Sequence, residues 1–294
     1  MNGDMYMKKV LIIGSGPAGI SASLYLARSN IADVTIISNG KGALAKAEMI
    51  ENYFGFAEPI SGKQLLENGK KGAERLGVKF IEAELTSLGF TDDMRYEAEY
   101  VGGRDSFDAV LIATGAARKA PSINGIKDFE GKGVSYCAVC DAFFYRGKDV
   151  AVIGSGDYAL HEASTLLQTA SSVTLLTNGQ ETNIELPEKI KLIKTGIKAL
   201  HGSDRLSSVE FDDGSSISVS GVFVAVGTAG STDFARKLGA AVDDGKIIVD
   251  ESFASNVPGV FAAGDCIGGL MQVSKAVSDG AAAGINMIRY LKQI

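Results

Sequence analysis

Two cysteines separated by two residues carry the clearest chemistry in this sequence. Cys137 and Cys140 stand in the segment VSYCAVCDAFFYRG and are followed directly by Asp141. A two-residue spacer lets two thiols close a small disulfide ring, and it lowers the pKa of one thiol so that a thiolate exists near neutral pH. The spacing predicts dithiol–disulfide exchange. A half-formed metal site and a pair of buried apolar thiols are the alternatives.

A glycine-rich turn near the start of the chain predicts a nucleotide site. Residues 8–38 read as an apolar strand, a tight turn, a helix with small residues and a second apolar strand, which together make a βαβ unit. Gly14 permits the turn, Gly16 lets the backbone approach a pyrophosphate, and Gly19 allows close packing of the helix on the strand. The alternative is a glycine turn that binds nothing.

A second unit of the same kind follows the cysteines, at residues 149–178. Gly154, Gly156 and Ala159 occupy its three glycine positions, and the order strand, helix, strand is repeated. We therefore predict an α/β fold with two Rossmann-like dinucleotide-binding-type domains, the second inserted into the first.

Two further strand ends indicate how the domains are connected. The apolar segment FDAVLIATG ends at residues 113–115 and gives way to polar residues, and the segment PGVFAAGD ends at residues 264–265 before a helix rich in small residues. We place the first domain at 1–116 and 243–294, and the inserted domain at 117–242.

The composition excludes several classes of protein. The chain has 294 residues, 46% of them hydrophobic, and a formal net charge of −6, with no basic stripe for nucleic acid. No apolar run reaches the roughly 18 residues of a membrane span, and the N-terminal segment lacks the layout of a cleavable signal, so we expect a cytoplasmic protein. Three cysteines and two histidines leave a zinc site short of ligands, so no metal site is expected.

The motifs occur in an order that resembles one family along essentially the whole chain. GSGPAG, ENYFGF, ATG, CAVCDAFFYRG, GSGDYA and PGVFAAGD follow one another as in the low-molecular-weight thioredoxin reductases. The resemblance implies that the first and last segments form an FAD domain and that the inserted segment is an NADPH-type domain carrying the CxxC. It also implies a homodimer that reduces thioredoxin.

The same resemblance assigns roles to individual residues. It implies that Cys140 faces the flavin, that Cys137 exchanges with thioredoxin, and that Asp141 supplies or accepts a proton, a role suited to a carboxyl whose pKa is raised by partial burial. It implies that the helix starting near Gln272 directs its N-terminus at the flavin ring and stabilises the anionic reduced form. The residues implied to bind FAD are Gly14, Ser15, Gly16, Pro17, Ala18, Gly19, Gly42, Leu44, Asn52, Ala113, Thr114, Gly115, Gly264, Asp265, Met271, Gln272 and Val273.

The second glycine turn departs from the family's NADPH site. Members that use NADPH carry a His-Arg-Arg run at this strand end, because a 2′-phosphate needs cationic partners. Here the stretch TNGQ at 177–180 has no positive charge, Thr177 stands where NAD would need an acid, and Glu181 is a weak substitute. Asp157 would repel a diphosphate, and the Tyr158 ring is expected to occupy the groove of a nicotinamide or ribose. We expect this domain to keep the fold without binding a pyridine nucleotide.

The sequence is most similar to the pyridine-nucleotide-independent, ferredoxin-dependent flavin type of thioredoxin reductase. Electrons would come from reduced ferredoxin, a separate protein, since three cysteines encode no iron–sulfur cluster here. Two alternatives stay open: an NAD(P)H-dependent reductase with an atypical nucleotide site, and a non-catalytic flavin and dithiol redox sensor. Ala43 and Met271 stand where the family often has Gln and usually has Arg, and these differences affect the detailed flavin contacts rather than FAD itself.

The remaining reactive or charged side chains are interpreted as structural. Cys266 is expected to be a small buried hydrophobe, and His161 and His201 are assigned structural roles. The lysines between residues 189 and 198 are interpreted as a solvated face. The candidates for docking an acidic ferredoxin are Lys189, Lys191, Lys194, Lys198, Arg118 and Lys119.

Overall fold

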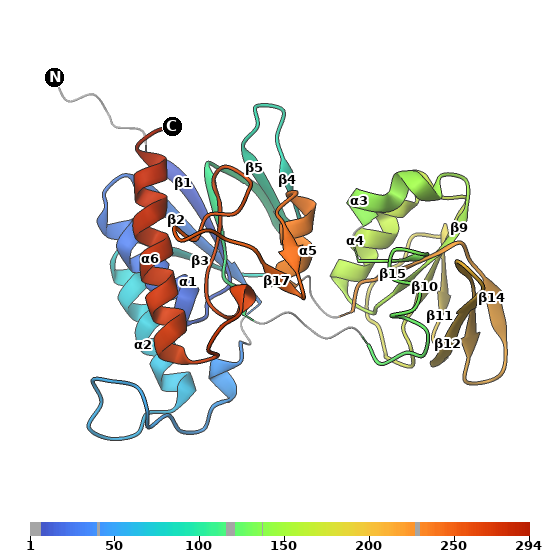
Figure 1. Ribbon diagram of the computed structural model, residues 1–294, viewed down its shortest axis with the longest axis horizontal. Helices are drawn as coiled ribbons and strands as arrows, with labels where there is room; N and C mark the ends of the chain where they lie inside the picture. Colours follow the sequence, from blue (N-terminus) through green and yellow to red (C-terminus); the bar gives the residue numbers. More distant parts are fainter. Residues whose placement is uncertain (1–6, 40–41, 116–120, 137, 227–229) are drawn as a thin grey trace. The chain divides into compact units, whose positions relative to one another are not determined.

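The chain forms two compact units, each built around its own parallel β-sheet (Figure 1). The first unit comprises residues 1–117 and 230–294, and the second comprises residues 118–229. This confirms the predicted α/β fold with one domain inserted into the other. The residues that the computed structural model describes are 7–39, 42–115, 121–136, 138–226 and 230–294.

Each unit combines parallel strands, antiparallel strands and helices. The elements of the first unit are β1 (Lys8–Ile13), α1 (Pro17–Arg28), β2 (Ala32–Ser38), η1 (Leu44–Lys46), α2 (Gly62–Arg75), β3 (Lys79–Glu82), β4 (Leu85–Phe90), β5 (Tyr96–Tyr100), β6 (Gly103–Phe107), β7 (Ala109–Ile112), α5 (Ser231–Lys237), β16 (Val242–Asp243), β17 (Lys246–Ile247), β18 (Val260–Ala262), η3 (Asp265–Ile267) and α6 (Val273–Leu291). Those of the second unit are β8 (Val134–Ser135), α3 (Ala138–Asp141), η2 (Ala142–Tyr145), β9 (Asp149–Ile153), α4 (Asp157–Leu166), β10 (Ser172–Leu176), β11 (Ile190–Ile193), β12 (Ile197–Gly202), β13 (Leu206–Phe211), β14 (Ser216–Ser218) and β15 (Gly221–Val224). Within the described parts of both units, no helix is long and apolar enough to cross a membrane.

The first unit is built on a five-stranded parallel sheet with the order β18-β7-β1-β2-β3. Val10 of β1 pairs with Val34 of β2 on one side and with Ala109 of β7 on the other. The last four residues of β1 are all buried, as expected for a parallel strand covered on both faces. Figure 1 shows α1, α2 and α6 on one side of this sheet and the antiparallel meander β4-β5-β6 on the other.

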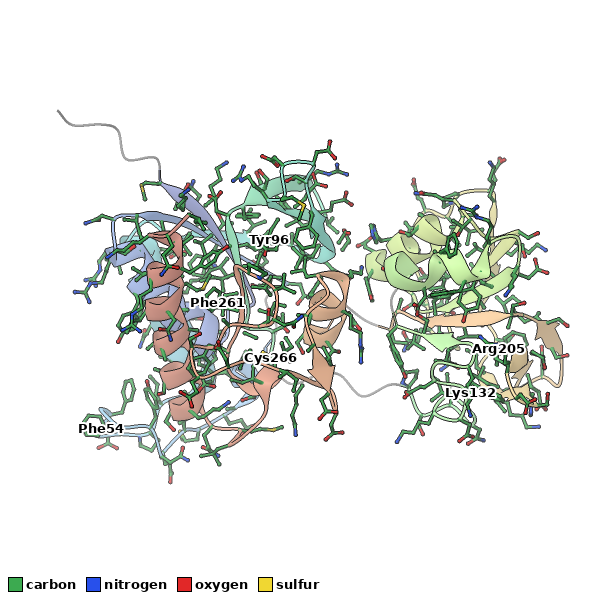
Figure 2. The ribbon with its side chains drawn as sticks, turned by 45° about the horizontal axis from the view of Figure 1, so that its top comes forward. Phe54, Tyr96, Lys132, Arg205, Phe261 and Cys266 are labelled. Atoms are coloured by element: carbon green, nitrogen blue, oxygen red, sulfur yellow. The ribbon has the colours of Figure 1, made fainter. Side chains whose placement is uncertain are left out.

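The apolar core of the first unit lies on both faces of this sheet. Phe261 of β18 is 3% exposed, and its ring centroid lies 6.0 Å from that of Tyr290 on α6. Tyr96 of β5 is also buried, donates its hydroxyl hydrogen to the carbonyl oxygen of Pro258, and has its pKa raised to about 12 by burial. Figure 2 shows both Phe261 and Tyr96 in the interior of the unit.

Helices α1 and α6 pack with their backbones in close contact. A Cβ at Gly280 would lie 2.1 Å from the carbonyl oxygen of Ala18, and one at Gly284 would lie 2.9 Å from that of Ala22. These distances are too short for any side chain, so glycine is required where the two helices approach most closely. The packing holds the last helix of the chain against the first.

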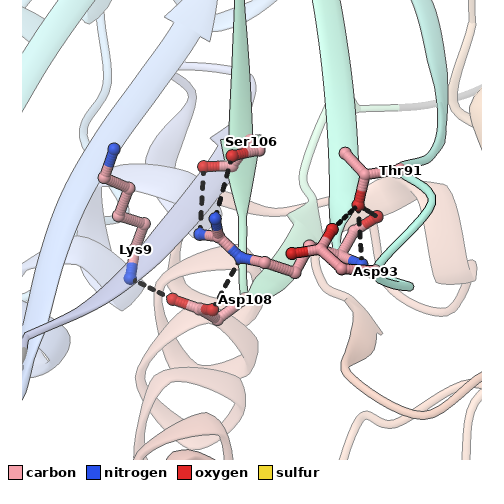
Figure 3. Close-up of polar contacts among 6 residues, drawn as sticks. Lys9, Thr91, Asp93, Ser106 and Asp108 are labelled. Carbon is pink, nitrogen blue, oxygen red and sulfur yellow. Dashed lines mark hydrogen bonds and ion pairs between the residues drawn. The ribbon is translucent and has the colours of Figure 1, made fainter.

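A charged cluster connects the meander to the parallel sheet (Figure 3). Arg95 Nε donates a hydrogen bond to Asp108 Oδ1 at 3.0 Å, and the backbone N–H of Lys9 donates to Asp108 Oδ2 at 2.7 Å. Arg95 Nη1 also donates to Ser106 Oγ at 3.0 Å. Asp108 therefore joins the start of β1 to the meander through one carboxylate.

The second unit repeats the plan of the first. Its parallel sheet has the order β11-β10-β9-β15-β8, and Val150 of β9 pairs with Val173 of β10 and with Gly221 of β15. The antiparallel strands β12-β13-β14 supply Val209 and Phe211 to its core. The two βαβ units predicted from the glycine spacing are thus the centres of the two units.

The first unit resumes earlier in the chain than the sequence placed it. We expected the return at residue 243, whereas the first unit resumes at residue 230. Helix α5 causes this difference, because it packs against β4 and β17 of the first unit. Lys237 of α5 also donates a hydrogen bond through Nζ to the carbonyl oxygen of Thr86 at 3.3 Å.

We expect Gly280→Ala to destabilise the protein by about 1–3 kcal/mol, because the methyl group would overlap the Ala18 carbonyl oxygen and push α6 from α1. Gly72→Ala is the matched control. Gly72 also lies within a helix, α2, but a Cβ there meets nothing within 4 Å, so helix propensity should stabilise that variant by up to about 1 kcal/mol. Thermal unfolding measures both, and a Gly280→Ala midpoint at or above that of the control would contradict the packing argument.

Candidate active site

The carboxyl ends of three neighbouring strands meet at one edge of the first sheet. Strand β1 leads into the turn at 14–16, β7 into residues 113–115, and β18 into residues 263–265. The hydrogen-bond ladder continues past the strands, since the Ala113 N–H donates to the Ile13 carbonyl oxygen at 2.9 Å. Ligands of open parallel sheets bind outside this edge. Most residues predicted to bind FAD therefore lie together.

Gly14 is the point at which the glycine turn touches the neighbouring strand end. Its φ is +109°, and a Cβ would lie 2.4 Å from the carbonyl oxygen of Ala113, so no other residue fits. The next residue of that strand end, Thr114, has a buried hydroxyl with no hydrogen-bond partner among the described residues. A buried polar group of this kind needs a partner, and a bound ligand would supply one.

Two helices begin at this edge without a side-chain cap. Helix α1 follows Gly16 with Pro17 as its first residue, and α6 follows Gln272. Their first backbone N–H groups point out of the helix and favour a negatively charged ligand. Asn52 Nδ2 donates a hydrogen bond to Gln272 Oε1 at 3.1 Å, which brings together two predicted FAD ligands that are far apart in the sequence.

An ion pair on α6 holds the end of β18, and the sequence analysis missed it. Asp279 Oδ2 accepts a hydrogen bond from the Gly264 N–H at 3.2 Å and lies 2.7 Å from Lys275 Nζ. Lys275 Nζ also donates to the carbonyl oxygens of Gly264 at 3.2 Å and Gly268 at 2.6 Å. The pair therefore fixes the backbone that precedes Asp265. Its i,i+4 spacing was visible in the sequence, but exposed helix faces show the same spacing.

The other predicted FAD ligands are distributed over the same edge and nearby loops. Ser15 Oγ accepts a hydrogen bond from Ser38 Oγ at 2.9 Å, Leu44 begins η1, and Gly42 and Met271 are exposed loop residues. The predicted residues that the structure places at the strand ends or in the first turns of α1, η3 and α6 are Gly14, Ser15, Gly16, Pro17, Ala18, Gly19, Ala113, Thr114, Gly115, Gly264, Asp265, Gln272 and Val273. Contact of each residue with FAD stays a prediction.

These features fit FAD. A turn without room for side chains, uncapped helix N–H groups and an unsatisfied buried hydroxyl are the groups that a dinucleotide site requires. The turn at 14–19 would hold the pyrophosphate, and Asp265 would meet the ribityl or pyrophosphate region.

Two of the three predicted redox residues lie on a short helix of the second unit. Helix α3 contains Cys140 and ends at Asp141, whereas Cys137 lies outside the described residues. Asp141 is half-buried, and its Oδ2 accepts a hydrogen bond from Ser135 Oγ at 2.7 Å. The buried Tyr145 lies close by, and burial together with the charge of Asp141 raises the pKa of its hydroxyl. The role of Asp141 in proton transfer stays a prediction.

A second carboxylate contacts this helix, and the sequence analysis did not identify it. Glu162 of α4 is 1% exposed, and its Oε2 accepts a hydrogen bond from the Ala138 N–H at 2.7 Å. Ala138 is the first residue of α3 and follows Cys137 in the chain. The helix that carries Cys140 thus has a carboxylate at each end.

Side chains of the loop after β10 contact the glycine turn of the second unit. Thr182 Oγ1 donates a hydrogen bond to the Ser155 carbonyl oxygen at 2.7 Å, and Ser155 Oγ donates to Gln180 Oε1 at 2.9 Å. Both bonds join the loop after β10 to the turn between β9 and α4. Asp157 is exposed in the first turn of α4. The Tyr158 side chain is 1% exposed and belongs to the interior, so it does not fill an open groove as we expected.

The end of β10 carries the neutral residues read from the sequence, and a cation that follows the next strand, β11, lies beside it. Thr177 is buried, and its hydroxyl has no hydrogen-bond partner among the described residues. The Gly179 N–H donates to the carbonyl oxygen of Lys194 at 2.8 Å. Lys194 Nζ lies 3.3 Å from Glu181 Oε2, so this cation is paired with a carboxylate.

Cys266 is confirmed as a buried thiol in the first unit (Figure 2). It is fully buried, and its Sγ donates to the carbonyl oxygens of Ile112 and Ala263, at 3.3 Å each. Burial raises the pKa of this thiol to about 12. Cys266 is therefore a packing residue at the end of β18.

The chain belongs to the pyridine nucleotide-disulphide oxidoreductase family, whose model matches residues 8–280. It is a flavin-dependent oxidoreductase that binds FAD. The thioredoxin reductase of Listeria monocytogenes is 32% identical over 305 residues, covering 97% of this chain and 94% of that protein. The thioredoxin reductase of Treponema pallidum is 34% identical over 292 residues, covering 93% and 94%. The chain is thus a homologue of thioredoxin reductases along nearly its whole length.

Solved structures of two kinds resemble the chain. The atypical thioredoxin reductase TRi from Desulfovibrio vulgaris Hildenborough is 39% identical with a TM-score of 0.92, covering 98% of this chain and 99% of that one. A ferredoxin-flavin thioredoxin reductase from Clostridium acetobutylicum is 28% identical with a TM-score of 0.70, covering 99% and 100%. These comparisons confirm the family resemblance read from the motifs.

We expect Asp279→Asn to weaken FAD binding about tenfold, because Lys275 loses its anionic partner and the end of β18 is held less firmly. Titration of FAD into the apoprotein, followed by flavin fluorescence, measures the Kd. Glu67→Gln, on the exposed surface of α2, is the control that removes the same charge elsewhere in the unit. Equal Kd values for the two variants would show that the ion pair does not support the site.

We expect Cys266 to resist alkylation in the folded protein. With the pKa of this thiol at about 12, its thiolate fraction at pH 8 is about 10⁻⁴, and the fraction rises only as the pH approaches 12. In the Cys137→Ser/Cys140→Ser double variant, iodoacetamide at pH 8 should add no mass to the native protein and one adduct to the unfolded protein. Rapid labelling of the native double variant would contradict the burial of this thiol.

Proposed function

We propose that this protein is an FAD-dependent thioredoxin-disulfide reductase that receives its electrons from reduced ferredoxin rather than from a pyridine nucleotide. The observation that carries the proposal is a pair of hydrogen bonds, one from Thr182 Oγ1 to the Ser155 carbonyl oxygen and one from Ser155 Oγ to Gln180 Oε1, which joins the second glycine turn to the loop after β10. In the first glycine turn, Ser15 Oγ accepts a hydrogen bond from Ser38 Oγ at the end of β2, and the residues around that turn fit FAD.

The dithiol step follows from the two cysteines and the adjacent acid. The Cys137 thiolate attacks one sulfur of the thioredoxin disulfide, forming a mixed disulfide and releasing the other sulfur as a thiolate. Cys140 then attacks the Cys137 sulfur, which forms the Cys137–Cys140 disulfide and releases the second thioredoxin thiolate. Thioredoxin gains two electrons and two protons. FAD, when bound, supplies the two electrons that reduce the Cys137–Cys140 disulfide again. Asp141, oriented by Ser135, would exchange protons with the thiols.

The surface beside the dithiol supports a protein substrate. Phe143 and Phe144 follow Asp141 closely and are 69% and 66% exposed. The guanidinium of Arg146 lies over the Phe143 ring, 5.3 Å from its centroid. Exposed aromatic residues next to a guanidinium are typical of surfaces that bind other proteins.

The charges at the second glycine turn support the exclusion of NADPH and NAD. A 2′-phosphate needs free cations, whereas Lys194 is paired with Glu181. The ribose of NAD needs an acid at the end of β10, where Thr177 stands. Asp157 adds a negative charge where a diphosphate would lie.

Ferredoxin is proposed as the donor because an iron–sulfur protein can deliver single electrons to a flavin. The ferredoxin-flavin thioredoxin reductase among the similar structures supports this choice. Of the candidate docking lysines, Lys194 and Lys198 have acidic partners. Lys189 and Lys191 have no ion pair among the described residues, which makes them the stronger candidates for an acidic partner. Arg118 and Lys119 lie outside the described residues, and the homodimer stays a prediction.

An NAD(P)H-dependent reductase is the second candidate, and one observation favours it. Lys194 lies beside the strand end at which NADPH-using members of the family place their cations, and a 2′-phosphate would compete with Glu181 for it. Lys194 is 54% exposed, so water weakens its attraction for either group.

We expect reduced ferredoxin to bleach the flavin anaerobically, and NADPH or NADH at micromolar concentration to leave it oxidised. Stopped-flow absorbance of the flavin measures all three donors side by side. Turnover with ferredoxin should fall as salt rises, because exposed charge pairs are screened over about 10 Å at 0.1 M ionic strength. Fast bleaching by NADPH without a response to ferredoxin would establish the second candidate instead.

Cys140→Ser is the control for the path of the electrons. Ferredoxin should still reduce the flavin in this variant, while thioredoxin stays oxidised. Wild-type protein that accepts electrons but does not reduce thioredoxin in steady state would instead fit a redox sensor.

A further inference from the structure

The loop before α6 carries an exposed methionine at the predicted FAD site. Met271 is 62% exposed, and the residue before it, Leu270, is 67% exposed. Gly268 and Gly269 precede them with φ values of +80° and +81°, so the chain turns sharply here. Lys275 Nζ holds this turn from α6 by donating to the Gly268 carbonyl oxygen at 2.6 Å. Met271 therefore follows a turn whose backbone is fixed from the helix.

Helix α6 begins directly after this methionine with its first N–H groups free. Gln272 precedes the first turn, and no side chain in the described parts of the chain caps that turn. The Gln272 side chain is engaged elsewhere, because its Oε1 accepts a hydrogen bond from Asn52 Nδ2 at 3.1 Å. The N–H groups of the first turn are therefore available to an anionic or strongly accepting group. FAD is the acceptor expected at this edge.

The thioether of methionine is oxidised by hydroperoxides. Hydrogen peroxide transfers one oxygen atom to the sulfur: the O–O bond breaks, an S=O bond forms, and the rest of the peroxide leaves as water. The sulfur loses two electrons and the peroxide gains two. The sulfoxide is polar and accepts hydrogen bonds, whereas the thioether is only a weak acceptor. Oxidation of Met271 therefore places an acceptor directly before a helix with free N–H groups.

The other methionines that the structure describes lie in different surroundings. Met94 is 73% exposed on the hairpin between β4 and β5, on the other side of the first sheet (Figure 1). Met49 is 63% exposed in the loop after η1, and Met7 is 44% exposed just before β1. Met287 of α6 is fully buried. Met271 differs from these four because it directly precedes an uncapped helix at the FAD site.

We propose that Met271 is an oxidation site that controls FAD binding. A hydroperoxide converts its thioether into a sulfoxide, and the sulfoxide oxygen competes with FAD for the N–H groups at the start of α6. Loss of FAD then stops electron transfer, and a methionine sulfoxide reductase reverses the change. The inference rests on the proposed function only through the FAD site and does not depend on the electron donor.

Peroxide treatment of the holoprotein tests this site. All proteins carry Cys137→Ser and Cys140→Ser, so that oxidation of the dithiol does not contribute. Peptide mass spectrometry reads the oxygen added at each methionine, and titration of FAD into the stripped protein, followed by flavin fluorescence, gives the Kd before and after treatment. We expect oxidised Met271, unmodified Met287 and an FAD Kd about tenfold weaker, which corresponds to the loss of one hydrogen bond to a charged group.

Three variants assign the effect to one side chain. After peroxide, Met271→Leu should keep the Kd that it has before treatment. Met94→Leu, at a site of similar exposure, and Met49→Leu, on the loop that contains Asn52, should lose FAD affinity as the parent does. Methionine sulfoxide reductases for both sulfoxide epimers should restore the Kd of the oxidised parent, which tests the site without a substitution at residue 271.

Three results would overturn the proposal: an unmodified Met271 in the treated protein, an oxidised Met271 with an unchanged Kd, or an equal loss of affinity in Met271→Leu. An untreated parent that binds no FAD would overturn the FAD site and this proposal together, and it is distinguished from the other results before any peroxide is added. Neither ferredoxin nor thioredoxin is used, so failure of the proposed electron path leaves this test intact.

Discussion

The structure depends on how closely parallel strands approach one another where they end. In the first unit, the turn after β1 lies so near the end of β7 that a side chain at Gly14 would collide with the Ala113 carbonyl oxygen. This crowding on one side forces the chain to turn sharply and to begin α1 with its N–H groups free. The open side of the turn then becomes the place for a charged ligand. Asp279 and Lys275 complete the edge by holding the end of β18 from α6.

The same backbone crowding occurs in the second unit, but the side chains around its glycine turn are different. The turn between β9 and α4 has the same glycine spacing, and a Cβ at Gly154 would lie 2.2 Å from the carbonyl oxygen of Ala225. The backbone at this edge is therefore built as in the first unit. In our proposal, the hydrogen bonds among Ser155, Gln180 and Thr182 occupy the space beyond the turn. Under this proposal, the fold and the choice of ligand are controlled by different residues.

Both βαβ units were predictable from the sequence, because glycine spacing and unbroken apolar strands are local patterns. The dithiol was predictable for the same reason. Contacts between distant segments were not, since nothing near Glu162 in the chain indicates that it meets Ala138. Tyr158 shows that a local sequence pattern can also predict the wrong position for a side chain. Its ring follows a glycine turn, but apolar surface favours the interior, and the ring is buried there instead of lining the groove.

In the proposed enzyme, any nucleotide would have to displace the hydrogen bonds at the glycine turn of the second unit. Gln180 and Thr182 lie in the loop after β10, within the same unit as Ser155, so their local concentration is set by the geometry of the chain and does not vary with conditions in solution. Tethered groups of this kind act at effective concentrations of about millimolar or more. A dinucleotide at micromolar concentration would therefore compete with side chains that have a much higher effective concentration and cannot diffuse away. Under the proposed function, the turn is a site already occupied by an intramolecular ligand.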